Sequence, residues 1–500
     1  MNKRDTNSHL HRPAESEPLA PHIRWALVGL CLSMLMPSLD TSIANAGLPS
    51  MATALDASFQ SVQWIVLAYL LAITTIIVSV GRLGDLVGRR RLLLFGIGLF
   101  TVASFLCGAA PTIWVLIVAR ALQGLGAAIM MSLTVAVVRE TVPSERLGSS
   151  IGLLGTMSAI GTSLGPSLGG ILIAGFGWRS IFFVNVPIGV LNYLLARRFL
   201  PADRVAAKTG RSHRFDIPGT VTLGLTLAAY ALAMTVGKGS FGTANTLLLA
   251  AGMVGLAAFV LIETRVSSPL INLTTFRNRE LRTGLTTSAL VSTVMMATLV
   301  VGPFYLTRGL GLDTMFAGVA LSVGPLFAAI AGVPAGKLVD RFGAQKMIVT
   351  GLAGIGIGAL AVSLLPPVLG VAGYITPIIV MTSSYALFQA ANNTSIMYGA
   401  GAEERGVISG MLSLSRNLGL ITGASVMGAI FAFASALTET TGAESDSVAI
   451  GMRTTFGVAT GLIVLAFVAV TASRWSHKKD SRQSNEVAEP SSDSALVTSS

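Results

Sequence analysis

Fourteen apolar runs, separated by short polar breaks, occupy the chain from about residue 25 to residue 472. Each run is long enough to cross a bilayer, because about 20 helical residues cover the hydrocarbon core. Hydrophobic residues make up 52% of the 500 and charged residues only 11%, whereas a soluble chain of this length carries about 25% charge. The sequence therefore predicts an all-α integral membrane protein.

The order of the runs predicts three membrane parts between two polar tails. Residues 24–199 would form a six-helix bundle, 200–270 a basic linker with two additional transmembrane helices, and 271–473 a second six-helix bundle. We expect a cytoplasmic tail at 1–23 and a disordered cytoplasmic tail at 474–500. The expected spans are 25–47, 61–80, 92–110, 113–138, 147–175, 178–198, 217–236, 245–264, 283–306, 314–335, 347–366, 371–397, 406–434 and 448–472.

Lysine and arginine residues are distributed unevenly over the breaks. With the N-terminus inside, the outer loops hold only Arg179, Lys238 and Arg308, and Arg453 stands at an outer helix start. Short basic loops stay in the cytoplasm, so both termini are expected there. This distribution accounts for the net charge of +11, and no nucleic-acid partner is expected. The first run is more typical of a retained helix than of a cleaved signal peptide.

A charged pattern occurs twice, in the breaks after the second and tenth runs. GRLGDLVGRRR (Gly81–Arg91) and GKLVDRFGAQK (Gly336–Lys346) share the spacing G-x3-D-x2-G. The copies lie 336 − 81 = 255 residues apart, which indicates a molecule built from two related halves, as in many secondary transporters.

Motifs of other function classes are absent from the sequence. There is no G-x4-G-K-[ST] phosphate cradle, so coupling to ATP hydrolysis within this chain is not expected. Cys31 and Cys107 lie inside apolar runs and are expected to be small buried hydrophobes rather than a disulfide or a metal site. We therefore expect no enzyme activity, no cofactor and no metal.

Five stretches of the first half together carry a family resemblance. They are SLDTSIANAGLPSM (Ser38–Met51), GRLGDLVGRRR, ARALQGLGAA (Ala119–Ala128), GTSLGPSLGG (Gly161–Gly170) and GWRSIFFVNVPIG (Gly177–Gly189). In this order they resemble the signatures of the major facilitator superfamily, in its fourteen-helix drug:proton antiporter branch, which includes bacterial multidrug and quaternary-ammonium efflux proteins. The resemblance covers nearly all of residues 24–474 and implies two six-helix bundles plus two extra central helices.

For the repeated loops, the resemblance implies a lock that holds the cytoplasmic side closed in an outward-open state. Leu86 stands where family members often carry a basic residue, and Ala344 and Gln345 replace the basic cluster of the second copy. The two loops would therefore contribute unequally. The alternative is a solvated loop that only sets topology. The expected gating residues are Gly81, Asp85, Gly88, Arg89, Arg90, Asp340 and Arg341.

Asp40 is a carboxylate inside the first run, where a charge at the bilayer centre costs at least about 2.5 kcal/mol. Burial favours its neutral form and a nearby cation its charged form, so one group could switch between them. Arg120, in the fourth run, is its expected partner. We predict that Asp40 and Arg120 couple proton and substrate, as the resemblance implies. The alternatives are a carboxylate satisfied by Thr41 or Ser42 and an arginine that binds backbone carbonyls.

Polar and aromatic side chains elsewhere in the runs are candidates for a substrate cavity. Tyr69 and Tyr305 could offer ring faces to a cation, and the spacing of Tyr385, Gln389 and Asn392 places them on one helix face. Ordinary core packing and interhelical hydrogen bonds are the alternatives. The expected cavity residues are Gln123, Tyr69, Tyr305, Tyr385, Gln389, Asn392 and Arg416.

Glycines recur every four residues in the fifth run and leave a stripe without side chains, interrupted by a proline that bends the helix. Such stripes most often serve packing. The resemblance implies a tight interface that discourages leak and favours exchange over uniport. The expected packing residues are Gly161, Gly165, Pro166, Gly169 and Gly170.

These features predict a proton-coupled efflux transporter in the inner membrane of a bacterium. Its partners would be the lipid bilayer, protons and a small amphipathic, cationic compound, exported by alternating access. We take a monomer as the working expectation. Two alternatives stay open: a proton-coupled transporter of one specific metabolite, and a receptor or structural membrane protein that kept the fold without transport.

Overall fold

The computed structural model describes residues 20–143, 146–203, 216–236, 242–266, 278–397, 404–436 and 444–488. Within these ranges, 14 helices are long and apolar enough to cross a membrane. The prediction of an all-α protein with fourteen membrane helices is confirmed. The basic cluster of the linker, at residues 204–215, and most of the N-terminal tail lie outside the described residues.

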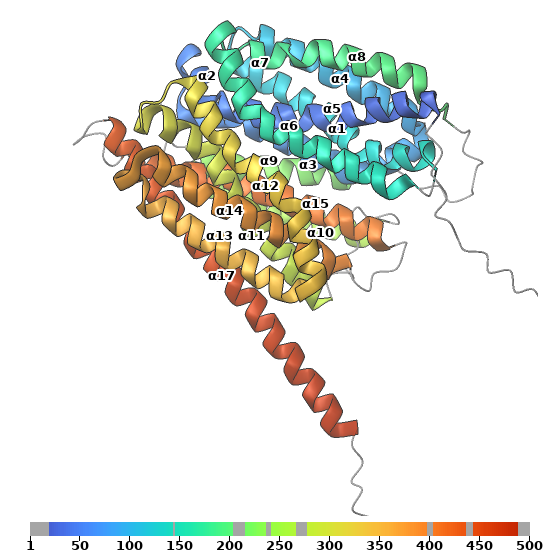
Figure 1. The fold of residues 1–500 in the computed structure, drawn as a ribbon, viewed down its shortest axis with the longest axis vertical. Coiled ribbons are helices and arrows are strands. Elements are labelled where there is room, and N and C mark those ends of the chain that lie inside the picture. The colour runs from blue at the N-terminus through green and yellow to red at the C-terminus, as the bar shows by residue number, and fades with distance from the viewer. Residues whose placement is uncertain are drawn as a thin grey trace, which may run out of the picture.

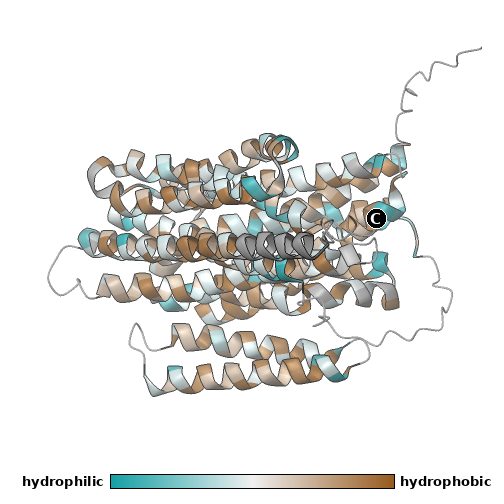
Figure 2. Cartoon of the chain, turned by 90° about the horizontal axis from the view of Figure 1, so that it is seen from below, coloured by the Kyte–Doolittle hydropathy of each residue, from teal (hydrophilic) through white to brown (hydrophobic). Residues whose placement is uncertain are grey.

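The first half of the chain forms a bundle at the top of Figure 1. Its helices are α1 (Pro21–Ala46), α2 (Leu48–Ala54), α3 (Phe59–Val87), α4 (Arg89–Ala109), α5 (Ile113–Thr141), α6 (Leu147–Phe176), α7 (Ser180–Phe183) and α8 (Asn185–Phe199). Helix α1 packs against α6 and α8, while α5 packs against α3 and α4. Apolar residues cover most of each helix (Figure 2), as the bilayer requires.

The second half forms a second bundle, below the first in Figure 1. Its elements are α11 (Arg279–Phe304), η3 (Tyr305–Gly309), α12 (Thr314–Phe342), α13 (Ala344–Leu364), α14 (Pro366–Met397), α15 (Glu404–Thr422), η4 (Gly423–Met427), α16 (Gly428–Ala436) and α17 (Glu444–Ala488). The short π-helical segments η3 and η4 continue α11 and α15. Helix α14 packs against both α12 and α13, and α17 packs against α11, α13 and α16.

A hairpin of two helices, α9 (Ile217–Thr235) and α10 (Thr243–Arg265), separates the halves in sequence. Helix α9 is hydrogen-bonded to α3 near both of its ends, through Ser79–Thr220 at 3.0 Å and Trp64–Thr235 at 3.1 Å. It also reaches the second bundle, where the Tyr230 hydroxyl lies 3.2 Å from the Thr422 hydroxyl. The hairpin therefore lies at the periphery, beside the seam between the bundles.

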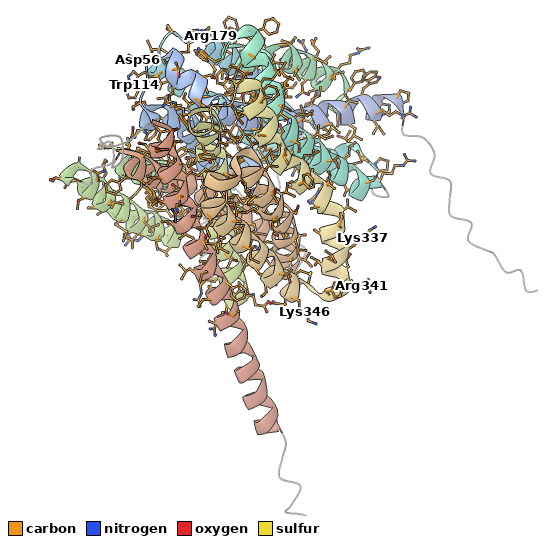
Figure 3. All side chains as sticks on the ribbon, turned by 60° about the vertical axis from the view of Figure 1, so that its left-hand side comes forward. Asp56, Trp114, Arg179, Lys337, Arg341 and Lys346 are labelled. Carbon is orange, nitrogen blue, oxygen red and sulfur yellow. The ribbon has the colours of Figure 1, made fainter. Side chains whose placement is uncertain are left out.

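The long helices run between two faces of the molecule. We call the face at which α1 begins and α17 ends the tail face, and the other the opposite face. Lys337, Arg341 and Lys346 lie toward the tail face, whereas Asp56 and Arg179 lie at the opposite face (Figure 3).

The two bundles contact each other in the half of the molecule nearer the opposite face. The Phe59 ring lies 4.7 Å from the Phe304 ring, centroid to centroid. Deeper in the molecule, Gln63 Nε2 donates to the Ala424 carbonyl oxygen at 3.0 Å. In the tail-side halves of α6 and α12, by contrast, the described glycines at 152, 155, 332 and 336 have open space around them. The conformation is thus closed at the opposite face.

The two charged segments predicted as loops are helical almost throughout. Gly88 alone connects α3 to α4, and Gly343 alone connects α12 to α13. Their φ angles are 105° and 85°, which glycine adopts without the steric cost that other residues pay. The last glycine of each G-x3-D-x2-G pattern therefore forms the corner. The expected spans 61–80 and 314–335 were too short, because the helices continue beyond their apolar runs.

Asp203, which the sequence did not single out, caps the start of α4. Its Oδ1 accepts from the Arg90 backbone N–H at 2.7 Å and its Oδ2 from the Arg91 N–H at 3.2 Å. A carboxylate at a helix N-terminus satisfies free N–H groups and complements the helix dipole. Because a Cβ atom at position 88 would lie 2.5 Å from Asp203 Oδ2, the cap also requires glycine there.

The C-terminal tail differs from its prediction. Helix α17 continues for 45 residues to Ala488 and projects from the bundle (Figure 1). Residues 474–488, for which disorder was expected, are helical in the structure; an established helix adds one hydrogen bond for each further residue. Residues 489–500 lie outside the described part.

The two corners provide a matched pair of substitutions. We expect Gly88→Ala to lower the melting temperature in detergent more than Gly343→Ala does. Both place a side chain in a strained conformation that costs about 1–3 kcal/mol, but only Gly88→Ala also displaces the Asp203 cap, since nothing lies within 4 Å of a Cβ at Gly343. Equal losses would contradict the capping role of Asp203.

Candidate functional site: a buried ion pair in the first bundle

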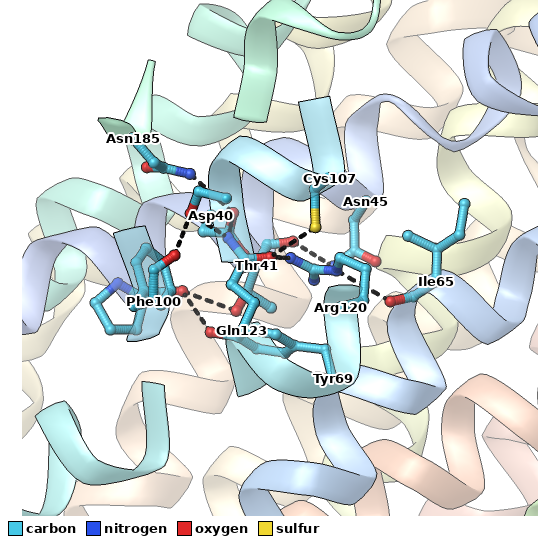
Figure 4. Close-up of polar contacts among 12 residues, drawn as sticks. Asp40, Thr41, Asn45, Ile65, Tyr69, Phe100, Cys107, Arg120, Gln123 and Asn185 are labelled. Atoms are coloured by element: carbon cyan, nitrogen blue, oxygen red, sulfur yellow. Dashed lines mark hydrogen bonds and ion pairs between the residues drawn. The ribbon is translucent and has the colours of Figure 1, made fainter. Parts of the chain in front are cut away.

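Asp40 lies within α1, and its side chain is fully buried inside the first bundle. Arg120 Nη1 donates to its Oδ2 and forms an ion pair (Figure 4). Gln123 Nε2 and Asn185 Nδ2 donate to its Oδ1 at 2.7 and 2.9 Å. The carboxylate therefore receives three hydrogen bonds from two helices, α5 and α8. Such bonds offset the cost of removing a charge from water.

Arg120 is also almost completely buried, with 1% of its surface exposed. Its Nε donates to the Ile65 carbonyl oxygen at 3.1 Å. The Tyr69 ring centroid lies 4.2 Å from the guanidinium carbon and the Phe182 ring centroid 5.8 Å from it. Cation–π contacts of this kind are strengthened when water is excluded. The guanidinium is therefore held by a charge, a carbonyl and two rings.

Gln123 connects the ion pair to α4. It follows Arg120 by three residues on α5, so both side chains lie on one helix face. Its Oε1 accepts from Arg120 Nη1 at 2.7 Å and its Nε2 also donates to Ser104 Oγ at 2.8 Å. The Cys107 thiol lies 3.6 Å from the same Oε1. The amide thus fixes the two charged groups relative to each other.

The structure distinguishes between the alternatives for Asp40. Thr41 Oγ1 donates to the Pro37 carbonyl at 2.8 Å, and Ser42 Oγ donates to the Thr162 carbonyl at 2.7 Å. Both hydroxyls are therefore used elsewhere, and the carboxylate is satisfied by Arg120 and two amides. Arg120 does bind one backbone carbonyl, in addition to Asp40 rather than in place of it.

Sequence reasoning missed Asn185 as a partner of the carboxylate. It lies in the stretch GWRSIFFVNVPIG, which was read only as a family signature. A polar amide two residues before Pro187, in an otherwise apolar helix, was the available signal, because buried amides require partners.

The polar residues of the second bundle do not join this site. Tyr385 and Gln389 do share a face of α14, where Gln389 Nε2 lies 2.5 Å from the tyrosine hydroxyl. Asn392 Nδ2 instead donates to the Gly284 carbonyl of α11 at 3.2 Å, the interhelical bond that was the alternative. Tyr305 is buried in η3 and Arg416 is half-buried on α15. Their contact with a substrate stays a prediction, as it does for Gln123 and Tyr69.

The gating residues are placed at the tail face. Asp340 and Arg341 are exposed there, and the Arg341 guanidinium lies 5.2 Å from the Phe342 ring. Arg89 pairs with Glu140 of α5 at 2.5 Å. The side chain of Asp85 lies outside what the structure describes, so its role stays a prediction.

The glycine stripe of α6 faces α1. Added Cβ atoms at Gly161, Gly165 and Gly169 would lie 2.7, 2.5 and 2.8 Å from atoms of α1, so the two helices are in close contact. Gly170 faces the other way, and its Cβ would lie 2.9 Å from the Thr314 carbonyl of α12. The motif therefore packs α6 against both its own bundle and the second one.

The residues that build this site fall within residues 30–424, which match the family described as Major Facilitator Superfamily. The chain belongs to this superfamily. Curated relatives and solved structures of the same fold are transporters and not enzymes, so the chain is a multi-pass membrane transporter of small molecules.

Curated relatives of the transporter include both drug exporters and a vitamin transporter. The riboflavin transporter RibZ of Clostridioides difficile is 32% identical over 82% of this chain and 88% of its own. The multidrug resistance protein Stp of Mycobacterium tuberculosis is 33% identical over 81% and 75%. The tetracenomycin C resistance and export protein of Streptomyces glaucescens is 30% identical over 84% and 78%.

Solved structures show the same fold at low sequence identity. The nucleoside transporter NupG matches with a TM-score of 0.65 at 15% identity, over 90% of this chain and 99% of its own. The xylose transporter XylE from E. coli matches with a TM-score of 0.61 at 13% identity, over 90% and 97%. The predicted major facilitator architecture is confirmed.

The buried pair should behave as a unit in stability measurements. We expect Arg120→Gln to destabilise the transporter by about 3–5 kcal/mol, because it leaves a buried carboxylate without its cation. Adding Asp40→Asn should recover much of this loss, since two neutral amides replace two charges. Thermal unfolding in detergent measures both variants.

The exposed pair Arg89–Glu140 is the matched control, with side-chain exposures of 34% and 49%. Arg89→Gln should change stability by at most about 1 kcal/mol. Additive losses for Asp40→Asn and Arg120→Gln would contradict a coupled pair.

Proposed function

We propose that the transporter is a proton-coupled antiporter that exports amphipathic, cationic compounds by alternating access. The observation that supports this most strongly is the buried Asp40–Arg120 pair. An ionisable carboxylate inside a membrane bundle is costly, and such residues usually serve proton or ion coupling. The permanent charge of the arginine leaves the aspartate as the group that can take up and release a proton.

Protonation of Asp40 changes the forces that hold α1 to α5. The neutral acid no longer attracts the guanidinium as a charge, while Arg120 keeps its bonds to Gln123 and to the Ile65 carbonyl. Helix α1 packs along the glycine stripe of α6, and α6 contacts α12 near the opposite face. A change at Asp40 can therefore reach the contact between the bundles through two packed helices.

The proposed substrate class rests on the relatives named above and on the negative charge of Asp40. The multidrug resistance protein Stp and the tetracenomycin C export protein favour efflux of toxic compounds. A carboxylate that alternates between a proton and a cation suits cationic compounds. The riboflavin transporter RibZ, equally similar to this chain, supports the second candidate: a proton-coupled transporter of one metabolite.

The proposed location is the bacterial inner membrane, with both termini in the cytoplasm. The curated relatives named above come from bacteria. Lys337, Arg341 and Lys346 lie toward the tail face, and short basic segments stay in the cytoplasm. The tail face would then be cytoplasmic, and the conformation described here would be closed toward the outside.

Transport in proteoliposomes tests the coupling. With an acidic lumen, we expect wild-type protein to accumulate ethidium as protons leave. Asp40→Asn should lower the initial rate about tenfold or more, which corresponds to about 1.4 kcal/mol in a barrier. Asp56→Asn is the control, because this exposed aspartate has a positive φ of 46° that asparagine also tolerates. Normal pH-driven uptake by Asp40→Asn would contradict the coupling role.

The same vesicles separate the two candidate substrates. If wild-type protein does not transport ethidium but takes up riboflavin in response to the pH gradient, the metabolite transporter is favoured. Transport of neither compound, and no substrate-driven pH change, would favour a protein that kept the fold without transport.

Cysteine labelling in intact cells tests the orientation. The native Cys31 and Cys107 are buried, so introduced cysteines can be read separately. We expect Ala54→Cys, in α2 at the opposite face, to react with an impermeant maleimide. Lys346→Cys, at the tail face, should react only after the cells are opened. The reverse pattern would contradict the proposed topology.

A further inference from the structure

A column of small and polar residues runs through the first bundle from Asp40 toward the tail face. Helices α1, α4 and α8 each contribute one face to it. We call it the polar column, and its members are Ser33, Thr101, Ser104, Asn185, Gly189 and Asn192. The proposed function uses only the end of the polar column at Asp40, where Asn185 and Ser104 contact the ion-pair site.

The other end of the polar column, nearer the tail face, is a second buried polar contact, which we call the lower contact. Asn192 Nδ2 donates to Ser33 Oγ at 2.9 Å, and Ser33 Oγ donates to the Gly29 carbonyl at 3.0 Å. Ser33 and Asp40 are seven residues apart on α1, as are Asn192 and Asn185 on α8. Seven residues make about two turns, or about 10.5 Å of rise. The lower contact therefore lies about two turns nearer the tail face than Asp40.

The two ends carry acceptors that the described protein groups do not satisfy. Asn185 and Asn192 are fully buried, and the Oδ1 atom of each has no hydrogen-bond donor among the described residues. A buried amide oxygen without a partner costs about 1–3 kcal/mol, and buried water commonly satisfies such groups. Between the ends, α8 approaches α4 so closely that a Cβ at Gly189 would lie 2.1 Å from Thr101 Oγ1.

Met36 lies between the two ends on α1, three residues after Ser33 and four before Asp40, so the three share one helix face. It is fully buried on α1, and Asn192 Nδ2 lies 3.9 Å from its sulfur. Methionine has three rotatable bonds and no branch, so it can leave and refill a space with little strain. On the side of α1 that faces α6, by contrast, direct bonds close the interface, with Ser38 Oγ 2.6 Å from Ser158 Oγ.

We propose that the polar column is a segment of the proton path to Asp40, on its tail side, with Met36 as its movable barrier. The inference rests on the proposed proton coupling. When the Met36 side chain moves aside, water bridges the free oxygens of Asn192 and Asn185. A hydronium ion then gives its proton to the Asp40 carboxylate, leaving water and a neutral acid, and the site gains one positive charge because Arg120 stays charged.

The other titratable groups around Asp40 are Tyr69 on α3, Cys107 on α4 and Arg120 on α5. Helix α8 contributes the neutral amide of Asn185, and α7 contributes the Phe182 ring. Among these groups the carboxylate is the proton acceptor, and it stands at one end of the polar column.

Two substitutions of Met36 test the path in proteoliposomes. Met36→Ile keeps the volume but stiffens the side chain, and we expect it to slow ethidium uptake driven by an acidic lumen about tenfold. Ethidium exchange at equal pH, which needs no net proton movement, should stay unchanged. Met36→Ser should increase proton leak without substrate, measured with entrapped pyranine. Met381→Ile, at a fully buried methionine of the second bundle, is the control.

The outcomes separate the path from the proposed function. A wild-type protein without pH-driven ethidium uptake would overturn both. If the wild type shows pH-driven uptake and the Met36 variants match it, the path alone is overturned. The same holds if the variants lose ethidium exchange and pH-driven uptake to the same extent. If the Met36 variants are not stable, Ser33→Ala decides, because it removes one oxygen of the lower contact. Ser33→Ala should slow pH-driven ethidium uptake and leave ethidium exchange at equal pH unchanged. Normal driven uptake, or an equal loss of exchange, overturns the path.

Discussion

The structure of the first bundle depends on one pair of opposite charges that water does not reach. A carboxylate and a guanidinium inside a membrane protein are tolerated only when each satisfies the other and further donors and acceptors complete both. Here Gln123 is bonded to both charges, while Asn185, the Ile65 carbonyl and the Tyr69 ring complete the site. Residues of α1, α3, α5 and α8 are therefore fixed around a single point, and the bundle is organised from there outward.

Close backbone packing extends this organisation to the second bundle. The glycine stripe brings α6 onto α1, and Gly170 brings α6 onto α12. Bulkier side chains at these positions would separate the helices, and in lipid no hydrophobic force would restore the contact. The electrostatic centre and the interface between the bundles are thus connected by positions that carry no side chain.

Much of this architecture could be predicted from the sequence, because the bilayer imposes a fixed length and polarity on each helix. The fourteen spans and the pairing of Asp40 with Arg120 followed from apolar runs and from the scarcity of buried charge. The helix ends did not, since α3 and α12 continue beyond their apolar runs, where hydropathy gives no signal. Asn185 and Asp203 were missed for a related reason: their partners lie 145 and 113 residues away, and only the fold brings them together.

The peripheral hairpin has a consequence for the surrounding lipid. Helix α9 has 19 residues and its neighbour α3 has 29, so α9 is about 28 Å long and α3 about 43 Å at 1.5 Å per residue. Only the shorter length fits a hydrocarbon layer of about 30 Å without tilt or overhang. Because α9 is bonded to α3 near both of its ends, a tilt of the shorter helix would also act on the longer one. A bilayer thicker or thinner than the length of α9 would therefore also act on α3, through the side chains that join the two helices.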